Sequence, residues 1–188
     1  MAAALELAAD PAAPATAKVL AAAKLAGVPL RLVSGGERTP CGLHVPVLTL
    51  PSGLKVRHAN AVLRRVGLSM ESELAGSSFV EEGQIDGWLE WVSLEVDHAE
   101  LSDPAELAAI LEALESHLKT RTFLVGQRLT LADVSAACSL RQALEKAGLD
   151  TLRAKYPNTI RWARTCFHHI GDTSAPKVAA PAKPAAAP

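Results

Sequence analysis

The stretch Phe123-Leu124-Val125-Gly126-Gln127-Arg128-Leu129-Thr130-Leu131-Ala132-Asp133 decides how this chain folds. It predicts an extended approach, a turn centred on Gly126 and a helix that begins at Thr130. Thr130 and Asp133 have the spacing of a capping box, in which the hydroxyl accepts from a backbone amide and the carboxylate reaches back to the first residue. Apolar residues surround the pair, so we expect the helix to enter the core. Thr130 and Asp133 are therefore predicted to be structural capping residues.

Further helix starts follow along the same half of the chain. Ser78 and Glu81 repeat the capping-box spacing, and Asp103 followed by Pro104 is typical of a capped first turn. Tyr156-Pro157 opens a last helix. Behind each start, apolar residues recur every three or four positions and predict one buried face per helix. Residues 76–170 are therefore predicted to form an all-helical domain.

The chain before residue 68 has a different pattern. Its apolar runs are short and separated by turn residues. Strands are expected at residues 5–7, 30–33, 45–50 and 54–56, and helices at 15–28 and 60–66. Residues 1–67 are therefore predicted to form a small mixed α/β layer, and the Ala/Pro/Lys-rich residues 171–188 a solvated linker.

Composition and charge exclude several classes of protein. The 188 residues carry 19 Lys+Arg against 20 Asp+Glu, a formal net charge of -1 that gives no general attraction for nucleic acid. No uninterrupted apolar run reaches the roughly 20 residues that cross a membrane. Cys41, Cys138 and Cys166 are widely spaced, and His168-His169 point about 100° apart on a helix, so neither a disulfide framework nor a metal site is indicated. A cytoplasmic protein is the simplest expectation.

These motifs resemble one known family. The pattern F-L-V-G-x-x-L-T-L-A-D is similar to the hallmark of the C-terminal helical domain of the glutathione transferase fold, and Val45-Pro46 resembles the Val-Pro of its thioredoxin-like half, where the proline is cis. The resemblance implies a glutathione transferase-like fold, with an abbreviated thioredoxin-like layer packed on the helical domain. Residues 77–78 and 84–91 resemble the first long helix of non-enzymatic members associated with translation, and residues 118–126, 138–140 and 156–162 look most like elongation factor 1 gamma subunits. Domains appended to glutamyl- and methionyl-tRNA synthetases are also similar.

The glutathione site of that family is degenerate here. The resemblance implies an acidic residue and a serine at the start of the third helix, but this chain has His58 and Ala59 there. After the first strand Thr16 is the only hydroxyl, and it falls inside the predicted helix. The eleven residues from Ser34 to His44 are too few for the family's second helix. We therefore expect no catalytic residue, no cofactor, and a degenerate glutathione site around Val45, Pro46, His58 and Ala59.

The resemblance then implies a function in assembly. We expect a non-catalytic scaffolding domain in translation, of the elongation factor 1 gamma type, that binds translation factor subunits or tRNA synthetases by pairing of similar domains. An appended synthetase domain and a glutathione-dependent transferase are the alternatives, and a homodimer is a further expectation. The resemblance implies a partner interface at Arg161 and Trp162, because an arginine directly before a tryptophan in this helix lies where similar domains of the family pair, and an arginine beside an aromatic residue suits a desolvated contact. An ordinary surface arginine is the alternative for Arg161.

Overall fold

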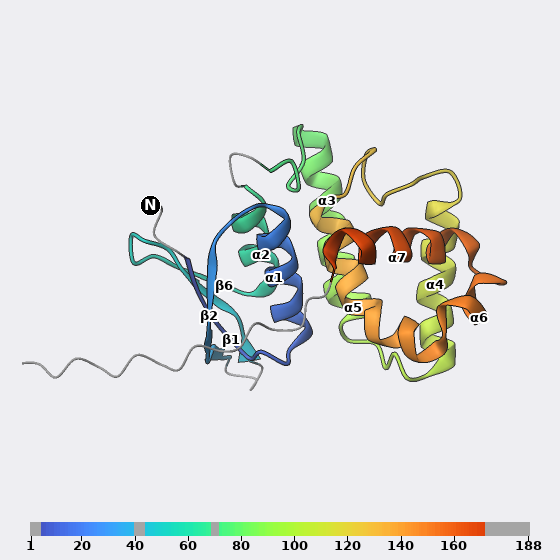
Figure 1. Cartoon of the computed structure of the whole chain (residues 1–188), viewed down its shortest axis with the longest axis horizontal. Helices are drawn as coiled ribbons and strands as arrows, with labels where there is room; N and C mark the ends of the chain where they lie inside the picture. The colour runs from blue at the N-terminus through green and yellow to red at the C-terminus, as the bar shows by residue number, and fades with distance from the viewer. Residues whose placement is uncertain (1–4, 40–43, 69–71, 172–188) are drawn as a thin grey trace, which may run out of the picture.

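The computed structural model describes residues 5–39, 44–68 and 72–171. Two layers lie side by side: a small sheet with two helices, and a helical domain (Figure 1). This arrangement confirms the glutathione transferase-like fold, with an abbreviated thioredoxin-like layer and a helical C-terminal half. The linker predicted for residues 171–188 falls, after Gly171, outside the described residues.

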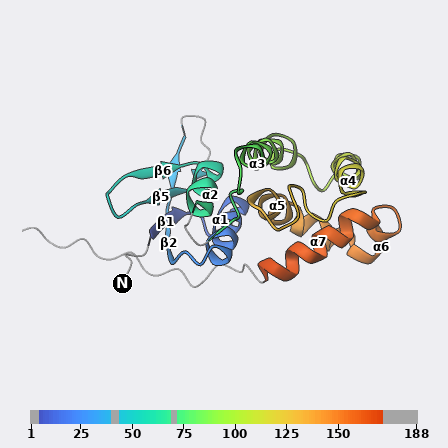
Figure 2. The same ribbon diagram turned by 90° about the horizontal axis from the view of Figure 1, so that it is seen from above.

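The sheet layer contains four strands in the order β2-β1-β5-β6. Its elements are β1 (Leu5–Ala9), α1 (Pro14–Leu25), β2 (Leu30–Ser34), β5 (Val47–Thr49), β6 (Lys55–Arg57) and α2 (Ala59–Gly67). β1 and β2 are parallel with α1 as their crossover, whereas β5 and β6 are antiparallel additions. Figure 2 shows α1 and α2 on the face of the sheet that looks toward the helical domain.

The opposite face of this sheet is covered by no helix among the described residues. The register places Leu7, Leu32 and Leu48 side by side on the covered face. Because side chains alternate between faces, Glu6 pairs with Arg31 on the other face, where their side chains are about half exposed. The outer face is therefore suited to solvent, as expected for a layer that lacks the family's second helix.

Two details of this layer differ from the prediction. The single strand expected at residues 45–50 is divided at Pro46, and its first part, β4 (His44–Val45), pairs with β3 (Glu37–Arg38) in a separate two-stranded sheet. Proline has no N–H to donate to a ladder, which explains the division. The cis bond that the resemblance implied at Pro46 is absent, because every peptide bond between described residues is trans.

The helical domain consists of five helices and one π-helical segment in the described residues. They are α3 (Phe79–Trp91) continuing into η1 (Val92–Val96), α4 (Pro104–Leu118), α5 (Leu131–Ala147), α6 (Leu149–Arg153) and α7 (Pro157–Ile170). Figure 2 places α5 in the middle, between α1 of the sheet layer, α3 and α7. The predicted apolar faces are buried, including Ile85 and Leu89 on α3 and Leu111 and Leu114 on α4. None of the described helices is long and apolar enough to span a membrane.

The capping box predicted at Ser78 and Glu81 forms only in part, because one of its two hydrogen bonds is present. Ser78 caps α3 by accepting from the amide of Glu81 at 3.3 Å. The carboxylate of Glu81 reaches one residue further back, to the amide and hydroxyl of Ser77, and also accepts from Arg128 at 2.6 Å. The hydrogen bonds from Ser77 and Arg128 lower the pKa of Glu81 to about 2. Glu81 therefore stays charged and ties the start of α3 to the loop before α5.

The box at Thr130 and Asp133 is complete, and the structure adds two partners to it. One carboxylate oxygen of Asp133 accepts from the amide and hydroxyl of Thr130, each at 2.9 Å. The other accepts from the amide of Leu124 at 2.9 Å and from the indole N–H of Trp162 at 2.8 Å. Asp133 and Trp162 are fully buried. This carboxylate therefore joins the loop before α5, the start of α5 and α7.

The start of α7 is capped from another helix. Tyr156 gives no side-chain cap, and the amides of Asn158 and Thr159 donate instead to Glu115 of α4, at 3.2 and 2.9 Å. Burial raises the pKa of the Glu115 carboxyl, but the hydrogen bonds from Thr159 and Asn158 outweigh it and the net pKa is lowered. The charged carboxylate thus fixes the position of α7 against α4.

The Asp133→Ala variant tests how far the fold depends on this carboxylate. The cap alone predicts a loss of about 1–2 kcal/mol. Because the change also leaves the donors of Leu124 and Trp162 buried without a partner, we expect about 3–5 kcal/mol, measured as the free energy of unfolding in denaturant. Asp103→Ala is the control, because this exposed cap of α4 accepts one hydrogen bond, from Ala105, and should cost about 1 kcal/mol. Equal losses in the two variants would contradict the role of the buried network.

Candidate functional site

The residues predicted to mark a degenerate glutathione site lie where α2 begins. His58 occupies the position before the first turn of α2, with an exposed side chain that makes no capping hydrogen bond, and Ala59 is the first helical residue. Neither residue offers a carboxylate or a hydroxyl. The start of α2 therefore lacks the charge-assisted hydrogen bonds that an α-amino acid group requires for tight binding.

The backbone of His58 nevertheless has an uncommon conformation. Its φ of 69° and ψ of 143° make it the only non-glycine residue with positive φ among the described residues. Such a conformation costs an L-residue of order 1–3 kcal/mol. The turn into α2 thus has a strained backbone at a residue without a carboxylate or hydroxyl.

The polar side chains of Glu37 and Arg57, near the start of α2, bind each other within the protein. Glu37 and Arg57 form an exposed ion pair, with 2.5 Å between Nε and Oε2, and the hydrogen bond from Arg57 lowers the pKa of Glu37. Val45 pairs with Glu37 across β3 and β4, and Val47 lies between β1 and β6. The carboxylate of Glu37 is thus paired with Arg57. The backbone on either side of Pro46 belongs to two different β-sheets.

Activated nucleophiles are absent from the residues described. The hydroxyl of Thr16 is buried and donates to the backbone carbonyl of Asp10 at 2.5 Å, so it cannot stabilise a thiolate. Burial raises the pKa of Cys138 to about 11 and also raises that of Cys166, so both remain thiols at neutral pH. Cys41 lies outside the described residues, and within them no cluster of His, Cys, Asp or Glu could hold a metal ion.

The predicted interface residues of α7 have different environments. Trp162 is fully buried, and its indole donates to Asp133, so its side chain has no surface to offer a partner. The interface role predicted for Trp162 is wrong, because the tryptophan is needed as a donor inside the core. Arg161 is exposed and donates to the carbonyls of Leu118 and Arg121 at 3.2 and 2.6 Å. Arg161 thus caps the C-terminal end of α4, and its charged group remains exposed to solvent.

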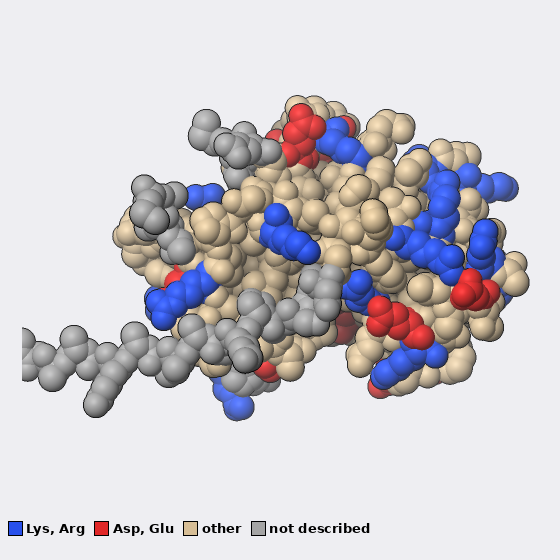
Figure 3. Space-filling view, in the orientation of Figure 1, with Lys and Arg blue, Asp and Glu red and all other residues tan. Residues whose placement is uncertain are grey.

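The face of the molecule that α7 occupies is rich in basic side chains. Figure 3 shows Lys and Arg gathered over the helical domain on this side, with fewer acidic groups among them. Arg164, one turn after Arg161, is partly offset by Asp150 at 2.6 Å, and Arg153 is exposed on α6. The chain as a whole has a net charge of -1, so this face differs from the average surface. An exposed basic helix face is suited to an acidic partner.

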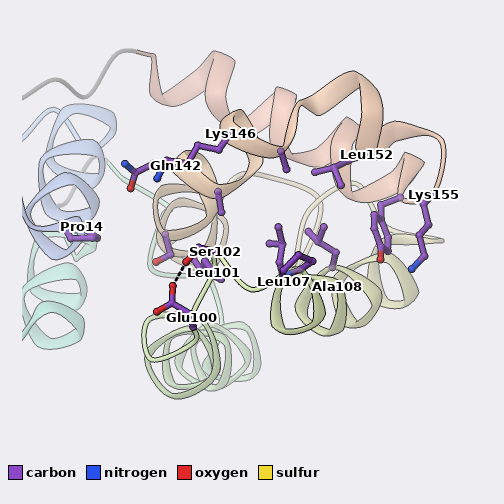
Figure 4. A pocket seen from close by; sticks show the side chains of 16 residues that line it. Pro14, Glu100, Leu101, Ser102, Leu107, Ala108, Gln142, Lys146, Leu152 and Lys155 are labelled. Atoms are coloured by element: carbon purple, nitrogen blue, oxygen red, sulfur yellow. Dashed lines mark hydrogen bonds between the residues drawn. The ribbon is translucent and has the colours of Figure 1, made fainter.

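A cavity of about 700 Å³ lies elsewhere in the helical domain, between α4, α5, α6 and the loop before α4 (Figure 4). Its walls are mainly apolar, with Leu107 and Leu152 on facing sides and Lys146 and Lys155 near the rim. Lys155 is paired with Glu112 at 3.0 Å. The residues that line the cavity include no cysteine and no histidine, and the hydroxyl of Ser102 donates to the carboxylate of Glu100 among them (Figure 4). The sequence did not predict this cavity, because the cavity depends on the packing of α4, α5 and α6, which are separate in the sequence.

The chain is similar to elongation factor 1 gamma proteins from distant organisms. It is 36% identical to elongation factor 1-gamma from Trypanosoma cruzi in an alignment 180 positions long, which covers 80% of this chain and 43% of the relative. It is 31% identical to the probable elongation factor 1-gamma 1 from Arabidopsis thaliana, over 89% of this chain and 51% of the relative. The chain thus spans about half, or less, of the length of these relatives. The family model for the glutathione S-transferase C-terminal domain matches residues 98–169.

Solved structures share the fold over nearly the whole chain. A possible glutathione S-transferase from Rhodopseudomonas palustris superposes with a TM-score of 0.77, covering 97% of this chain and 94% of that one at 20% identity. A glutathione S-transferase-I bound with lactoylglutathione gives a TM-score of 0.73, with 92% and 99% covered at 18% identity. At these identities the likeness shows a common fold.

The strain at His58 predicts an unusual response to glycine. The His58→Gly variant should raise the free energy of unfolding by about 1 kcal/mol, because glycine adopts positive φ without steric cost. Ala61→Gly, at an exposed position inside α2, is the control and should lower it by about 1 kcal/mol. Denaturant unfolding of both variants measures the difference. A loss at His58 as large as that at Ala61 would show that the backbone there is not strained.

Proposed function

We propose that this chain, a glutathione S-transferase-like protein related to elongation factor 1-gamma, is a non-catalytic scaffolding domain of the translation machinery in the cytoplasm. The observation that carries the proposal is the sequence similarity to elongation factor 1-gamma, which extends over at least 80% of the chain in relatives from plants, trypanosomes and mammals. Its role would be to hold the nucleotide-exchange subunits of an elongation factor complex together.

The chemistry at the start of α2 supports the absence of catalysis. A transferase must bind glutathione and stabilise its thiolate. Here His58 and Ala59 supply no partner for the glutathione amino acid group, and the hydroxyl of Thr16 is turned into the protein. The fold has therefore retained the shape of an enzyme whose reacting groups are missing from the described residues.

We assign partner binding to the exposed face of α7. Arg161 is fixed by two backbone carbonyls, so its guanidinium loses little conformational entropy when a partner binds. Its remaining N–H groups and the neighbouring basic side chains suit a carboxylate on the partner. The partner would be a translation factor subunit with a similar domain, or a tRNA synthetase if the chain belongs to a synthetase complex. Affinity capture from the source cell separates these alternatives, since exchange subunits and synthetases are distinguished by mass spectrometry.

The absence of glutathione chemistry is directly testable. We expect no retention of the purified chain on immobilised glutathione and no conjugation of glutathione to an aryl halide above the uncatalysed rate, because the missing hydrogen bonds leave binding weak. The double variant His58→Glu with Ala59→Ser restores the carboxylate and hydroxyl and should show measurable retention on the resin. Turnover by the unmodified chain would overturn the non-catalytic assignment.

The Arg161→Ala variant tests the α7 surface. We expect binding to the captured partner to weaken about tenfold or more, which corresponds to about 1.4 kcal/mol, mainly through faster dissociation. Because Arg161 also closes the end of α4, a modest fall in the unfolding midpoint should accompany it, so affinity is measured by calorimetric titration well below that midpoint. Arg65→Ala, which removes an exposed arginine on α2 in the sheet layer, is the matched control and should bind normally. Unchanged affinity for Arg161→Ala would remove α7 from the interface.

A further inference from the structure

The cavity between α4, α5 and α6 has an apolar lining with polar groups at its edge (Figure 4). Leu107, Leu111 and Ala143 are buried, and together with Ala108 and Leu152 they supply most of the aliphatic wall. Its volume of about 700 Å³ falls in the range of roughly 300–1,000 Å³ in which proteins bind small organic molecules. The cavity is therefore large enough to hold a ligand with an apolar body.

This cavity is distinct from the degenerate glutathione site and from the exposed face of α7. Its lining contains neither His58 nor Ala59, and Pro14, the first residue of α1, is what the sheet layer contributes to it among the described residues. Arg161 is also not part of the lining. A ligand in this cavity would therefore leave both of the other sites free.

Small side chains keep the cavity open between the helices. Ala108 on α4 and Ala143 and Ala147 on α5 all line it, and none of these side chains extends beyond Cβ. The lining residues on α5 run from Ser139 to Ala147, about 12 Å of helix at the usual rise per residue. Apolar surface that remains open to water in this way is stabilised when an apolar group covers it.

The charged groups of the lining differ in whether the protein already pairs them. The carboxylate of Glu100 accepts from the hydroxyl of Ser102, and Lys155 pairs with Glu112 at 3.0 Å. Lys146, in the last turn of α5, is exposed and forms no hydrogen bond or ion pair with any residue that the structure describes. Its ammonium group is therefore available to a ligand.

A second donor lies on the same side of α5. Gln142 precedes Lys146 by four residues, a spacing that places two side chains on one face of a helix, and both residues line the cavity. The amide of Gln142 likewise has no partner within the described part of the chain. An ammonium group and an amide N–H₂ are both donors, and a carboxylate can accept from both. Figure 4 shows Glu100 well apart from Lys146, so the acidic group does not cancel this charge.

We propose that this cavity binds a small amphipathic carboxylate, with its apolar body against Leu107, Leu111 and Leu152 and its carboxylate beside Gln142 and Lys146. Burial of the apolar body supplies the main driving force, and the charge-assisted hydrogen bond from Lys146 fixes the orientation. An aliphatic chain and an aromatic ring system both satisfy this chemistry, so the test uses one of each. The inference goes beyond the proposed scaffolding function and does not depend on it.

The test is calorimetric titration of the 188-residue chain with decanoate and, separately, with naphthalene-2-carboxylate. We expect saturable binding of at least one of these acids with one molecule per chain, and the acid that binds identifies the kind of apolar body. The uncharged primary amide of that acid should bind about tenfold more weakly or worse, because it keeps the apolar body and loses the charged head.

Two variants locate the ligand in the cavity. Lys146→Met keeps the length of the side chain and removes its charge, so it should weaken binding of the acid about tenfold and leave the amide nearly unaffected. Ala147→Trp places a large side chain at an exposed position of the lining and should weaken the acid and the amide alike. Both positions are exposed, so the unfolding midpoints should change little.

The matched control is Lys55→Met, which makes the same change at an exposed lysine of β6 in the sheet layer and should leave binding unchanged. The absence of saturable binding of either acid up to millimolar concentration would overturn the proposal. Equal affinities for the acid and its amide would do so too, as would binding that survives both Lys146→Met and Ala147→Trp. If neither acid binds and Ala147→Trp instead loses a captured protein, the cavity belongs to a protein partner and the proposal is wrong.

Discussion

The buried carboxylate of Asp133 is the interaction on which the arrangement of the helical domain depends. It accepts four hydrogen bonds, from the amides of Leu124 and Thr130, the Thr130 hydroxyl and the Trp162 indole. Burial raises the pKa of this carboxyl, although the four donors act in the opposite direction. Because a buried polar group is costly unless it is fully paired, the donors must converge at one point. The loop before α5, the first turn of α5 and α7 are thereby held in one relative position.

Paired polar groups also join the sheet layer to the helical domain. Lys18 of α1 is almost fully buried and pairs with Asp97, after η1, at 2.5 Å, and Ser139 of α5 donates to the other oxygen of that carboxylate. Lys24 of α1 donates to the carbonyl of Ile170 at the end of α7. Both lysines come from the sheet layer and satisfy groups of the helical domain. Loss of Asp97 would leave the buried charge of Lys18 unpaired, so the layers are expected to act as one unit.

The chain shares its fold with glutathione transferases, whereas the start of α2 lacks the carboxylate and hydroxyl that the resemblance implies. His58 has a strained backbone and no carboxylate or hydroxyl, Cys138 is partly buried and Cys166 is buried, and burial raises the pKa of both thiols. The exposed basic side chains of α7 include Arg161 and Arg164. Under the proposed function, this face binds the partner.

The sequence by itself determined most of the strands and helices and the cap at Thr130 and Asp133, because capping and periodicity depend on residues close together in the chain. It did not show the separate pairing of β3 with β4, or helix α6. Only the tertiary structure decided that Trp162 is a core donor, that Glu115 caps α7 from α4, and that Arg161 closes the end of α4. Each of these contacts joins residues 29 to 44 positions apart. Local patterns cannot show them, because the partner of a buried polar group is chosen by how whole helices pack.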